Sequence, residues 1–387
     1  MATPGTTAGD VLGLIRGHKA VTRADIRRVT GLSRTAVTLR VEQLLEHGLV
    51  AERAEGGSTG GRPPTRLAFN PESGTVLAAS IGASRAQVAA CDLVGTVLTE
   101  SEFAVPSTGD AQAVFGMAAE HLRRLMAKLP PEQSVYGLGV SVPSAVDIAT
   151  GHSLAAGTGV GEVAVAEFFV EQFAVPVRVD SDVNVLALAE HRRHPEVDDL
   201  LVLKTSTGIG AGIIAGGRLQ RGAWGAAGDI GHIKLGGGDD RPCRCGDRGC
   251  LETEAAGWAL LGRFTDLGRP LSGLPELAEL ARGGDPDAVR LVREAGRRIG
   301  EVLAAAVNLL NPAVVVVRGD LSHAFEPMVA GLRERIYQYS SALSTSNLRI
   351  EPGADDAPTG IQACAAMILD RILATDAINA LLDDVRH

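Results

Sequence analysis

The stretch GHIKLGGGDDRPCRCGDRGCLETE, residues 231–254, holds three of the five cysteines of the chain within eight positions. A disulfide between Cys243 and Cys245 would close a strained ring, and a redox pair is usually a CxxC motif beside a helix. Zinc fits better, because Cys250 adds a third thiolate and His232 is the nearest candidate for a fourth donor. Four protein donors leave no open position on the metal, so we predict one structural zinc ion bound by these four residues.

The predicted zinc loop, residues 232–250, lies between two carboxylates, Asp229 and Glu252. A metal-clamped loop would hold both side chains toward one place, as rigid acceptors for a polyhydroxylated ligand. The alternative is a surface zinc knuckle that only stabilises its own loop.

The composition favours a soluble α/β protein. A chain of 387 residues is long enough for two or three domains, and its 47 glycines and sparse aromatics fit turns between strands and helices. No apolar run has the length of a membrane span, and the first twenty residues lack the pattern of a secretory signal. An odd, clustered set of cysteines argues against a disulfide framework, so we expect a cytoplasmic protein without membrane contact.

Charge is unevenly distributed along the chain. Residues 1–70 hold 10 Lys+Arg and 6 Asp+Glu, a net charge of +4. The remainder has 27 basic and 40 acidic side chains (37 − 10 and 46 − 6), a net charge of −13. A basic segment on an acidic body indicates a polyanionic partner for that segment alone, against the alternative of chance surface composition.

The segment VTRADIRRVTGLSRTAVTLRVEQLLEHGLV, residues 21–50, is typical of a helix-turn-helix unit. Thr22 is expected to cap a short first helix, Gly31 to supply the turn, and the next serine to cap the second helix. The face of the second helix opposite its apolar residues carries short polar and basic groups suited to a major groove. The predicted DNA contacts are Ser33, Arg34, Thr35, Thr38 and Leu39.

The following residues, 49–70, read as strand, flexible tip and strand, which together form a wing. The tip GGRPP presents Arg62 on an extended backbone, suited to a narrow minor groove. We therefore predict a winged helix-turn-helix domain over residues 1–70. A three-helix bundle with no DNA-binding role would use the same caps and apolar spacings.

The body contains two segments of the same design, residues 75–98 and 200–219. In each, an apolar strand enters a Gly/Ser/Thr turn whose amides could face an anion, and two further strands follow. This recurrence predicts a duplicated fold with a cleft between two lobes, although each turn alone could be an ordinary hairpin. The candidate loop residues are Ser80, Gly82, Ser84, Thr207, Gly208 and Gly210.

The segment FAVPVRVDSDVNVLALAEHR, residues 173–192, reads as strand, polar turn and helix. Asp180 and Asp182 fall where the strand ends, a usual place for chemistry in an α/β sheet. Asp182 could equally cap the helix. A buried strand is predicted over residues 312–320, between helical stretches near 286–310 and 357–383.

These segments resemble the ROK family (repressors, open reading frames, kinases) along nearly the whole chain. The most specific match is Gly231-His232 followed by CRCGDRGCLE, the zinc signature of the family. The resemblance implies that residues 71–387 form two α/β lobes of the actin-like, sugar-kinase-type ATPase fold, after the winged domain. It assigns zinc to the same four side chains.

In the family's kinases an Asn-Asp pair binds the sugar, and its Asp is the general base; here the pair reads Ser181-Asp182. The family's Gly-Glu-x-Gly-His becomes residues 228–232, with Asp229 in place of Glu. Glu252, which follows the last cysteine, matches the glutamate of the family at this position. The resemblance thus implies a partly altered sugar site made of Ser181, Asp182, Asp229, His232 and Glu252.

The nucleotide side departs further from the kinases. Their first phosphate loop, Asp-x-Gly-x-Thr, is Ser80 to Ser84 here and lacks the metal-positioning Asp, while the second loop survives as residues 207–210. Arg318-Gly319 replaces a Gly-Gly near the adenosine, where an arginine would crowd the purine. Without that carboxylate, phosphoryl transfer loses much of its electrostatic support.

We therefore predict a ROK-type transcriptional regulator, a repressor, that binds operator DNA as a homodimer or tetramer and senses a sugar or sugar-derived ligand without being an enzyme. The first alternative is a bifunctional sugar kinase with Asp182 as its base. The second is a regulator that senses no ligand, or binds a partner protein on its acidic body.

Overall fold

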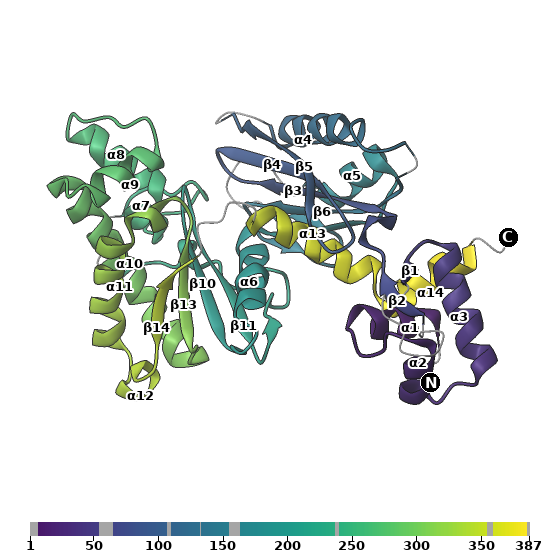
Figure 1. The fold of residues 1–387 in the computed structure, drawn as a ribbon. Coiled ribbons are helices and arrows are strands. Elements are labelled where there is room, and N and C mark those ends of the chain that lie inside the picture. Colours follow the sequence, from purple (N-terminus) through teal and green to yellow (C-terminus); the bar gives the residue numbers. More distant parts are fainter. Residues whose placement is uncertain are drawn as a thin grey trace.

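The computed structural model describes residues 7–53, 65–106, 110–131, 133–154, 163–236, 240–353 and 359–384. Two five-stranded sheets form two lobes, and a small helical unit built around the amino terminus adjoins the first lobe (Figure 1). Among the described residues, no helix combines the length and hydropathy that crossing a bilayer requires.

The first lobe is built on a sheet of order β5-β4-β3-β6-β9. Its strands are β3 (Thr75–Ile81), β4 (Arg85–Cys91), β5 (Val97–Ala104), β6 (Val135–Val142) and β9 (Val177–Ser181). The first three are antiparallel neighbours, whereas β6 and β9 extend the sheet in parallel from β3. Helices α4 (Ala111–Met126) and α5 (Val165–Phe173) bury Phe115 and Phe169 against one face.

The second lobe repeats this topology in the sheet β12-β11-β10-β13-β14. Its strands are β10 (Leu200–Thr205), β11 (Ile209–Ala215), β12 (Arg218–Leu219), β13 (Val314–Arg318) and β14 (Arg349–Pro352). The apolar core on one face draws on α7 (Glu252–Ala255), α8 (Gly257–Asp266), α9 (Leu274–Arg282), α10 (Pro286–Leu310) and α11 (Phe325–Tyr339), and α12 (Ala342–Thr345) contacts α10 and α11. Because both sheets share one strand order, the predicted duplicated, actin-like fold is confirmed.

The two lobes exchange helices. Helix α6 (Asp182–Arg193) follows the last strand of the first sheet but packs on β11 and β10 of the second. Helix α13 (Thr359–Ile372) follows the second sheet but packs on β3 and β6 of the first, and it also contacts α6 (Figure 1). The exchange brings the carboxyl end of β9 next to the second lobe.

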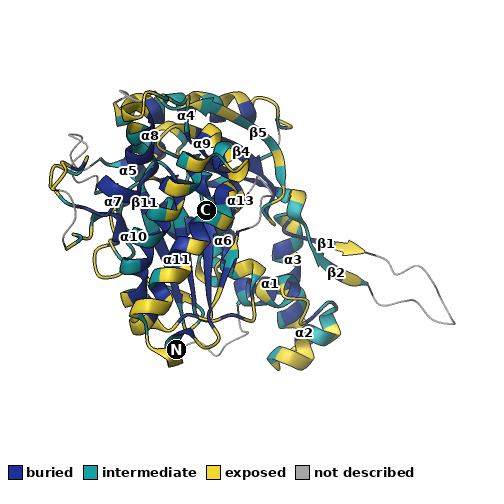
Figure 2. Cartoon of the chain, turned by 90° about the vertical axis from the view of Figure 1, so that its left-hand side faces the viewer, coloured by how far each residue is buried: buried dark blue, intermediate teal, exposed yellow. Residues whose placement is uncertain are grey.

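The amino-terminal unit, here called the head, has the predicted helix-turn-helix. Helices α2 (Arg23–Thr30) and α3 (Arg34–Glu46) are capped by Thr22 and Ser33, which accept hydrogen bonds from backbone N–H groups at 3.1 and 3.2 Å. Gly31 makes the turn at φ 71°, a left-handed conformation that suits glycine. Strands β1 (Val50–Arg53) and β2 (Arg66–Phe69) pair as the sides of the wing (Figure 2).

The head also contains one helix that was not predicted, and its partner comes from the predicted helical stretch near 357–383. Helix α1 (Ala8–Arg16) precedes the helix-turn-helix and packs against α14 (Thr375–Asp384) from the other end of the chain. The N–H of Gly9 donates to Asn379 Oδ1 at 2.9 Å. One apolar cluster runs from α1 through Leu67 to α13 and α14. The carboxyl-terminal helices therefore complete the core of the head.

Candidate functional site

The four predicted metal donors meet at one point of the second lobe. Their ligand atoms all lie within 4.8 Å of one another. Cys243 Sγ is 3.6 Å from His232 Nδ1, and Cys245 Sγ is 3.7 Å from Cys250 Sγ. Local sequence explains this convergence, because Gly246 turns the chain at φ 89° between the second and third cysteine. The cluster could hold one metal ion.

The surroundings of the cluster fit a bound cation with thiolate ligands. Cys243 and Cys250 are buried, and burial raises the pKa of the Cys243 thiol to about 12, so a metal has to displace its proton. Lys234 Nζ lies 3.4 Å from Cys250 Sγ and 2.6 Å from Asp247 Oδ2. Its ammonium can stabilise a thiolate, a supporting role that the sequence analysis missed. Three sulfurs and an imidazole are a donor set that zinc prefers.

Glu252 links this cluster to the second glycine loop. Its buried carboxylate accepts from the N–H of Ile209 at 2.8 Å and from the indole of Trp258 at 3.3 Å. A methyl group on Gly208 would lie 2.6 Å from Glu252 Oε1, so a larger residue there would displace this carboxylate. Thr207 and Gly210 flank this contact. The loop that the sequence marked as a possible anion site is therefore anchored from α7.

Ser181 and Asp182 stand at the junction of β9 with α6. Ser181 Oγ accepts from the N–H of Asn184 at 3.4 Å and caps the helix. The alternative that Asp182 is the cap is therefore wrong, because Asp182 is already in the first helical turn. Its carboxylate instead forms an ion pair with Lys204 at the carboxyl end of β10. The sequence signal for Lys204 is one lysine in the apolar run LLVLKT.

Asp180 forms a second ion pair between the lobes. It is completely buried, and its Oδ2 accepts from Arg221, in the loop after β12, at 2.8 Å. Its Oδ1 accepts from the side chain of Asn184 at 2.7 Å and from the N–H of Ser181 at 2.9 Å. A buried carboxylate needs this many donors to offset its lost hydration.

A third ion pair joins Arg318 to Glu190. Arg318 ends β13, and its Nε lies 2.7 Å from a carboxylate oxygen of Glu190, which is 1% exposed. Lys204 and Arg318 are register partners on parallel strands. The arginine that the sequence placed near a purine is thus buried against α6. Asp229, by contrast, is exposed just before His232.

The first glycine loop is a hairpin between β3 and β4. The N–H of Gly82 donates to the carbonyl of Arg85 at 2.9 Å, and Ser84 is exposed at the tip. Ser80 Oγ accepts from Ser141 at 3.2 Å, beside Gly360 at the start of α13. The predicted strand-turn-strand pattern is confirmed in both lobes.

The head presents the predicted DNA-contacting side chains on one helix. Ser33, Arg34, Thr35 and Leu39 are exposed at or near the start of α3, and Thr38 is half-buried. Arg62 lies outside the described residues.

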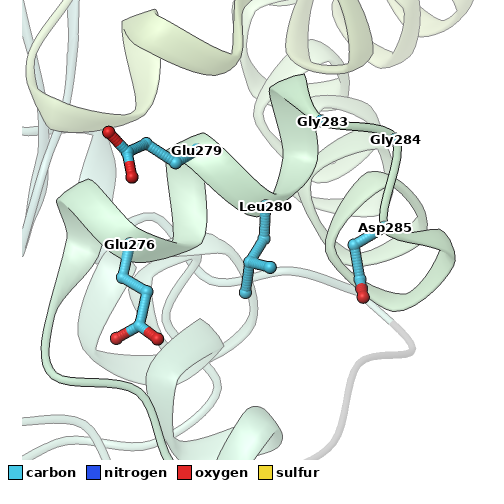
Figure 3. A pocket seen from close by; sticks show the side chains of 6 residues that line it. All are labelled: Glu276, Glu279, Leu280, Gly283, Gly284 and Asp285. Carbon is cyan, nitrogen blue, oxygen red and sulfur yellow. The ribbon is translucent and has the colours of Figure 1, made fainter.

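A hollow of about 420 Å³ lies in the helical layer of the second lobe (Figure 3). Its lining comes from α9 and the turn before α10. Glu276 there accepts from Ser272, and Asp285 caps α10 and pairs with Arg269 at 2.7 Å. These carboxylates are engaged within their own layer, and none of the candidate site residues lines the hollow.

Comparison with known proteins agrees with this arrangement. The family model described as ROK family matches residues 76–370. A xylose repressor of Caldicellulosiruptor bescii is 28% identical, with 94% of this chain and 95% of that protein covered. An N-acetylglucosamine repressor of Escherichia coli O6:H1 is 28% identical, with 92% and 90% covered. The crystal structure of a ROK family transcriptional regulator, a homologue of the E. coli MLC protein, has a TM-score of 0.79 at 23% identity and covers 98% of this chain and 99% of its own. This chain belongs to the ROK family.

Proposed function

We propose that the protein is a DNA-binding transcriptional regulator, a repressor, whose head binds operator DNA. The observation that carries this proposal is the exposed start of α3, where Arg34 and Thr35 stand beyond the Gly31 turn. Helices of this kind insert their first turns into a major groove. The two repressors named above, which match this chain over nearly its whole length, support the same reading.

The ligand in this proposal is a sugar or sugar-derived molecule bound where the lobes meet. Its candidate partners are Ser181, Asp182, Asp229, His232 and Glu252. Hydroxyl groups of a sugar would donate to carboxylates held by the exchanged helix α6 and by the metal loop. The named relatives make D-xylose and N-acetyl-D-glucosamine the first ligands to test. Binding would shift the population between two lobe arrangements, and with it the position of the heads.

We also propose that the body is not a kinase. Asp182, the residue at the position of the base, is paired with Lys204, and Arg318 is buried against Glu190. Ser80 stands where the kinases carry a metal-positioning carboxylate. The glycine loops would then be vestigial.

The metal in this proposal is a structural zinc ion, one per chain, on His232, Cys243, Cys245 and Cys250. Reading a pseudopalindromic operator calls for a homodimer or tetramer. Operator binding would require access to the chromosome, and we propose the cytoplasmic location that the sequence predicts.

The DNA-binding proposal is tested by gel shift against the region upstream of the protein's own gene. Arg34→Ala with Thr35→Ala should abolish the shift, because the pair removes a phosphate or base contact and a polar group from the groove-facing turn. Arg290→Ala, a basic residue exposed on α10, serves as the control and should bind normally. Unchanged binding by the double variant would overturn this reading of α3.

A second candidate is a bifunctional sugar kinase, favoured by Asp182 at the carboxyl end of β9. A coupled assay with ATP, Mg²⁺ and a panel of D-xylose, D-glucose and N-acetyl-D-glucosamine separates the two. Turnover that disappears in Asp182→Asn would establish a kinase. Calorimetry with the same sugars decides between a sensor and a regulator that takes no small ligand.

A further inference from the structure

The metal loop touches α8 through an arginine that stands between two of its cysteines. The guanidinium carbon of Arg244 lies 4.9 Å from the ring centroid of Trp258. At this distance a cation is attracted to the face of an indole. Arg244 is otherwise an exposed residue, so the contact with the indole can position its guanidinium.

Trp258 in turn holds the second glycine loop, by two routes. Its indole N–H donates to Glu252 Oε2 at 3.3 Å, and the other oxygen of that carboxylate accepts from Ile209 at 2.8 Å. Its backbone N–H donates to the carbonyl of Thr207 at 3.4 Å, while Gly257 beside it donates to Ser206 at 2.9 Å. Residues 206–209 are thus bound to the start of α8 and to α7.

Little free space remains along this connection. A methyl group on Gly231 would lie 3.0 Å from Glu252 Cγ, and one on Gly208 would lie 2.6 Å from Glu252 Oε1. Glu252 is therefore tightly packed between Gly231, which precedes His232, and the loop of residues 206–210. Cys250, two positions earlier, is tied to the same turn because its carbonyl accepts from Thr253 at 2.9 Å.

We propose that Arg244 and Trp258 are positioning residues that transmit metal occupancy to the loop of residues 206–210. This inference rests on the proposed zinc site and is independent of the ligand identity. A bound ion fixes the two cysteines that flank Arg244, and so fixes the guanidinium over the indole. The indole then holds Glu252 on the N–H of Ile209. Loss of the metal frees Arg244, loosens Trp258 and releases the loop.

Intrinsic fluorescence provides the first test, because the chain has two tryptophans, Trp224 and Trp258. Trp224→Phe leaves Trp258 as the reporter. EDTA should shift its emission to longer wavelength, and added ZnSO₄ should reverse the shift. Trp258→Phe leaves Trp224, which is 75% exposed, and its emission should not respond.

Hydrogen exchange of peptides covering residues 206–210 provides the second test. Chelation should raise their exchange rate about tenfold, as expected for local opening. Arg244→Gln should keep its metal, measured by atomic emission, yet exchange faster at these residues. Arg248→Gln is the matched control, since that arginine pairs with Asp240 in the same loop. Arg244→Lys should restore part of the protection.

The outcomes separate the two proposals. Bound metal in Arg244→Gln and Trp258→Phe, with loop exchange equal to that of the parent, would refute the positioning role and leave the zinc site intact. A parent protein that binds no metal would reject the zinc site and this inference together.

Discussion

At the scale of single residues, three ion pairs lie at the junction of the lobes. Lys204, Arg221 and Arg318 of the second lobe each hold one carboxylate of the segment from Asp180 to Glu190. Asp180 and Glu190 are buried, and buried charges persist only when they are paired. A sugar that binds Asp182 has to share it with, or take it from, an ammonium group. In the proposed sensor, Lys204 therefore tunes the ligand affinity.

The Lys204 pair can be tested by stability. Lys204→Met should destabilise the protein by about 1–3 kcal/mol, because it leaves a largely buried carboxylate without its partner. Thermal unfolding measures the loss, and Asp182→Asn in the same chain should recover part of it. Lys128→Met, which changes an exposed lysine, is the control. A Lys204→Met protein as stable as the parent would show that the pair contributes nothing.

The metal cluster makes a separate prediction at this scale. Purified protein should hold about one zinc per chain, and Cys245→Ser should lower both metal content and melting temperature, because three donors bind zinc more weakly than four. Atomic emission and calorimetric melting measure the two. Asp240→Asn, in the same loop but outside the donor set, should change neither. Apo protein that melts like holo protein would contradict a structural role.

At the scale of elements, α13 and α14 connect the first lobe to the head. Gly360 at the start of α13 lies beside Ser80. Cys364 of the same helix packs against Gly139 of β6, where a methyl group on the glycine would overlap the carbonyl oxygen of Cys364. Further along, Thr375 packs against Gly9 of α1. A movement of the lobes therefore has a packed helical route to the head, which would connect the proposed ligand site to the proposed DNA-binding helices.

Two glycines of α1 offer a matched test of the docking of α1 on α14. A methyl group on Gly9 would overlap the carbonyl oxygen of Thr375, whereas one on Gly13 meets nothing within 4 Å. Gly9→Ala should cost about 1–3 kcal/mol by overpacking. Gly13→Ala should add about 0.5–1 kcal/mol through helix propensity. Thermal unfolding compares the two variants. Equal melting temperatures would mean that the stability of the protein does not depend on the packing of α1 against α14.

At the scale of the whole molecule, charge separates a basic amino-terminal segment from an acidic remainder of the chain. Residues 1–70 carry a net +4 and the rest a net −13, which sum to the −9 of the chain. DNA repels the acidic remainder, so residues 1–70 should be the part of the chain that faces the phosphates. Affinity for the operator should therefore depend strongly on salt.

The salt dependence is predicted to follow counterion release. The logarithm of the binding constant should fall linearly with the logarithm of salt concentration, and Arg34→Ala should reduce the slope by about one if it removes one phosphate contact. Fluorescence anisotropy with an operator duplex at several salt concentrations measures this slope. The body variant Arg290→Ala should leave the slope unchanged. A slope near zero for the parent would rule out phosphate-driven binding.

Much of the fold and the metal cluster could be predicted from the sequence because they depend on local rules. Thr22 and Ser33 cap helices within three residues of themselves, and Gly31 supplies a turn. The cysteine spacing brings donors together within one loop. Strand periodicity gave the repeated hairpins of both lobes. Each of these features is set by neighbours along the chain.

The remaining features are contacts between distant segments. Arg221 meets Asp180 across 41 positions, and Gly9 meets Asn379 across 370. The sequence shows a lysine in an apolar strand, but it does not show which carboxylate the lysine pairs with, because any nearby carboxylate would serve. In the same way, a helix at one end of the chain has an apolar face that could pack on many other helices. Chain order alone therefore determined the class of protein, the four clustered side chains that could hold a metal, and the helix-turn-helix. Only tertiary packing decided which cations pair with the carboxylates at the junction of the lobes and which helices pack against the head. These contacts depend on the exchange of α6 and α13 between the two sheets.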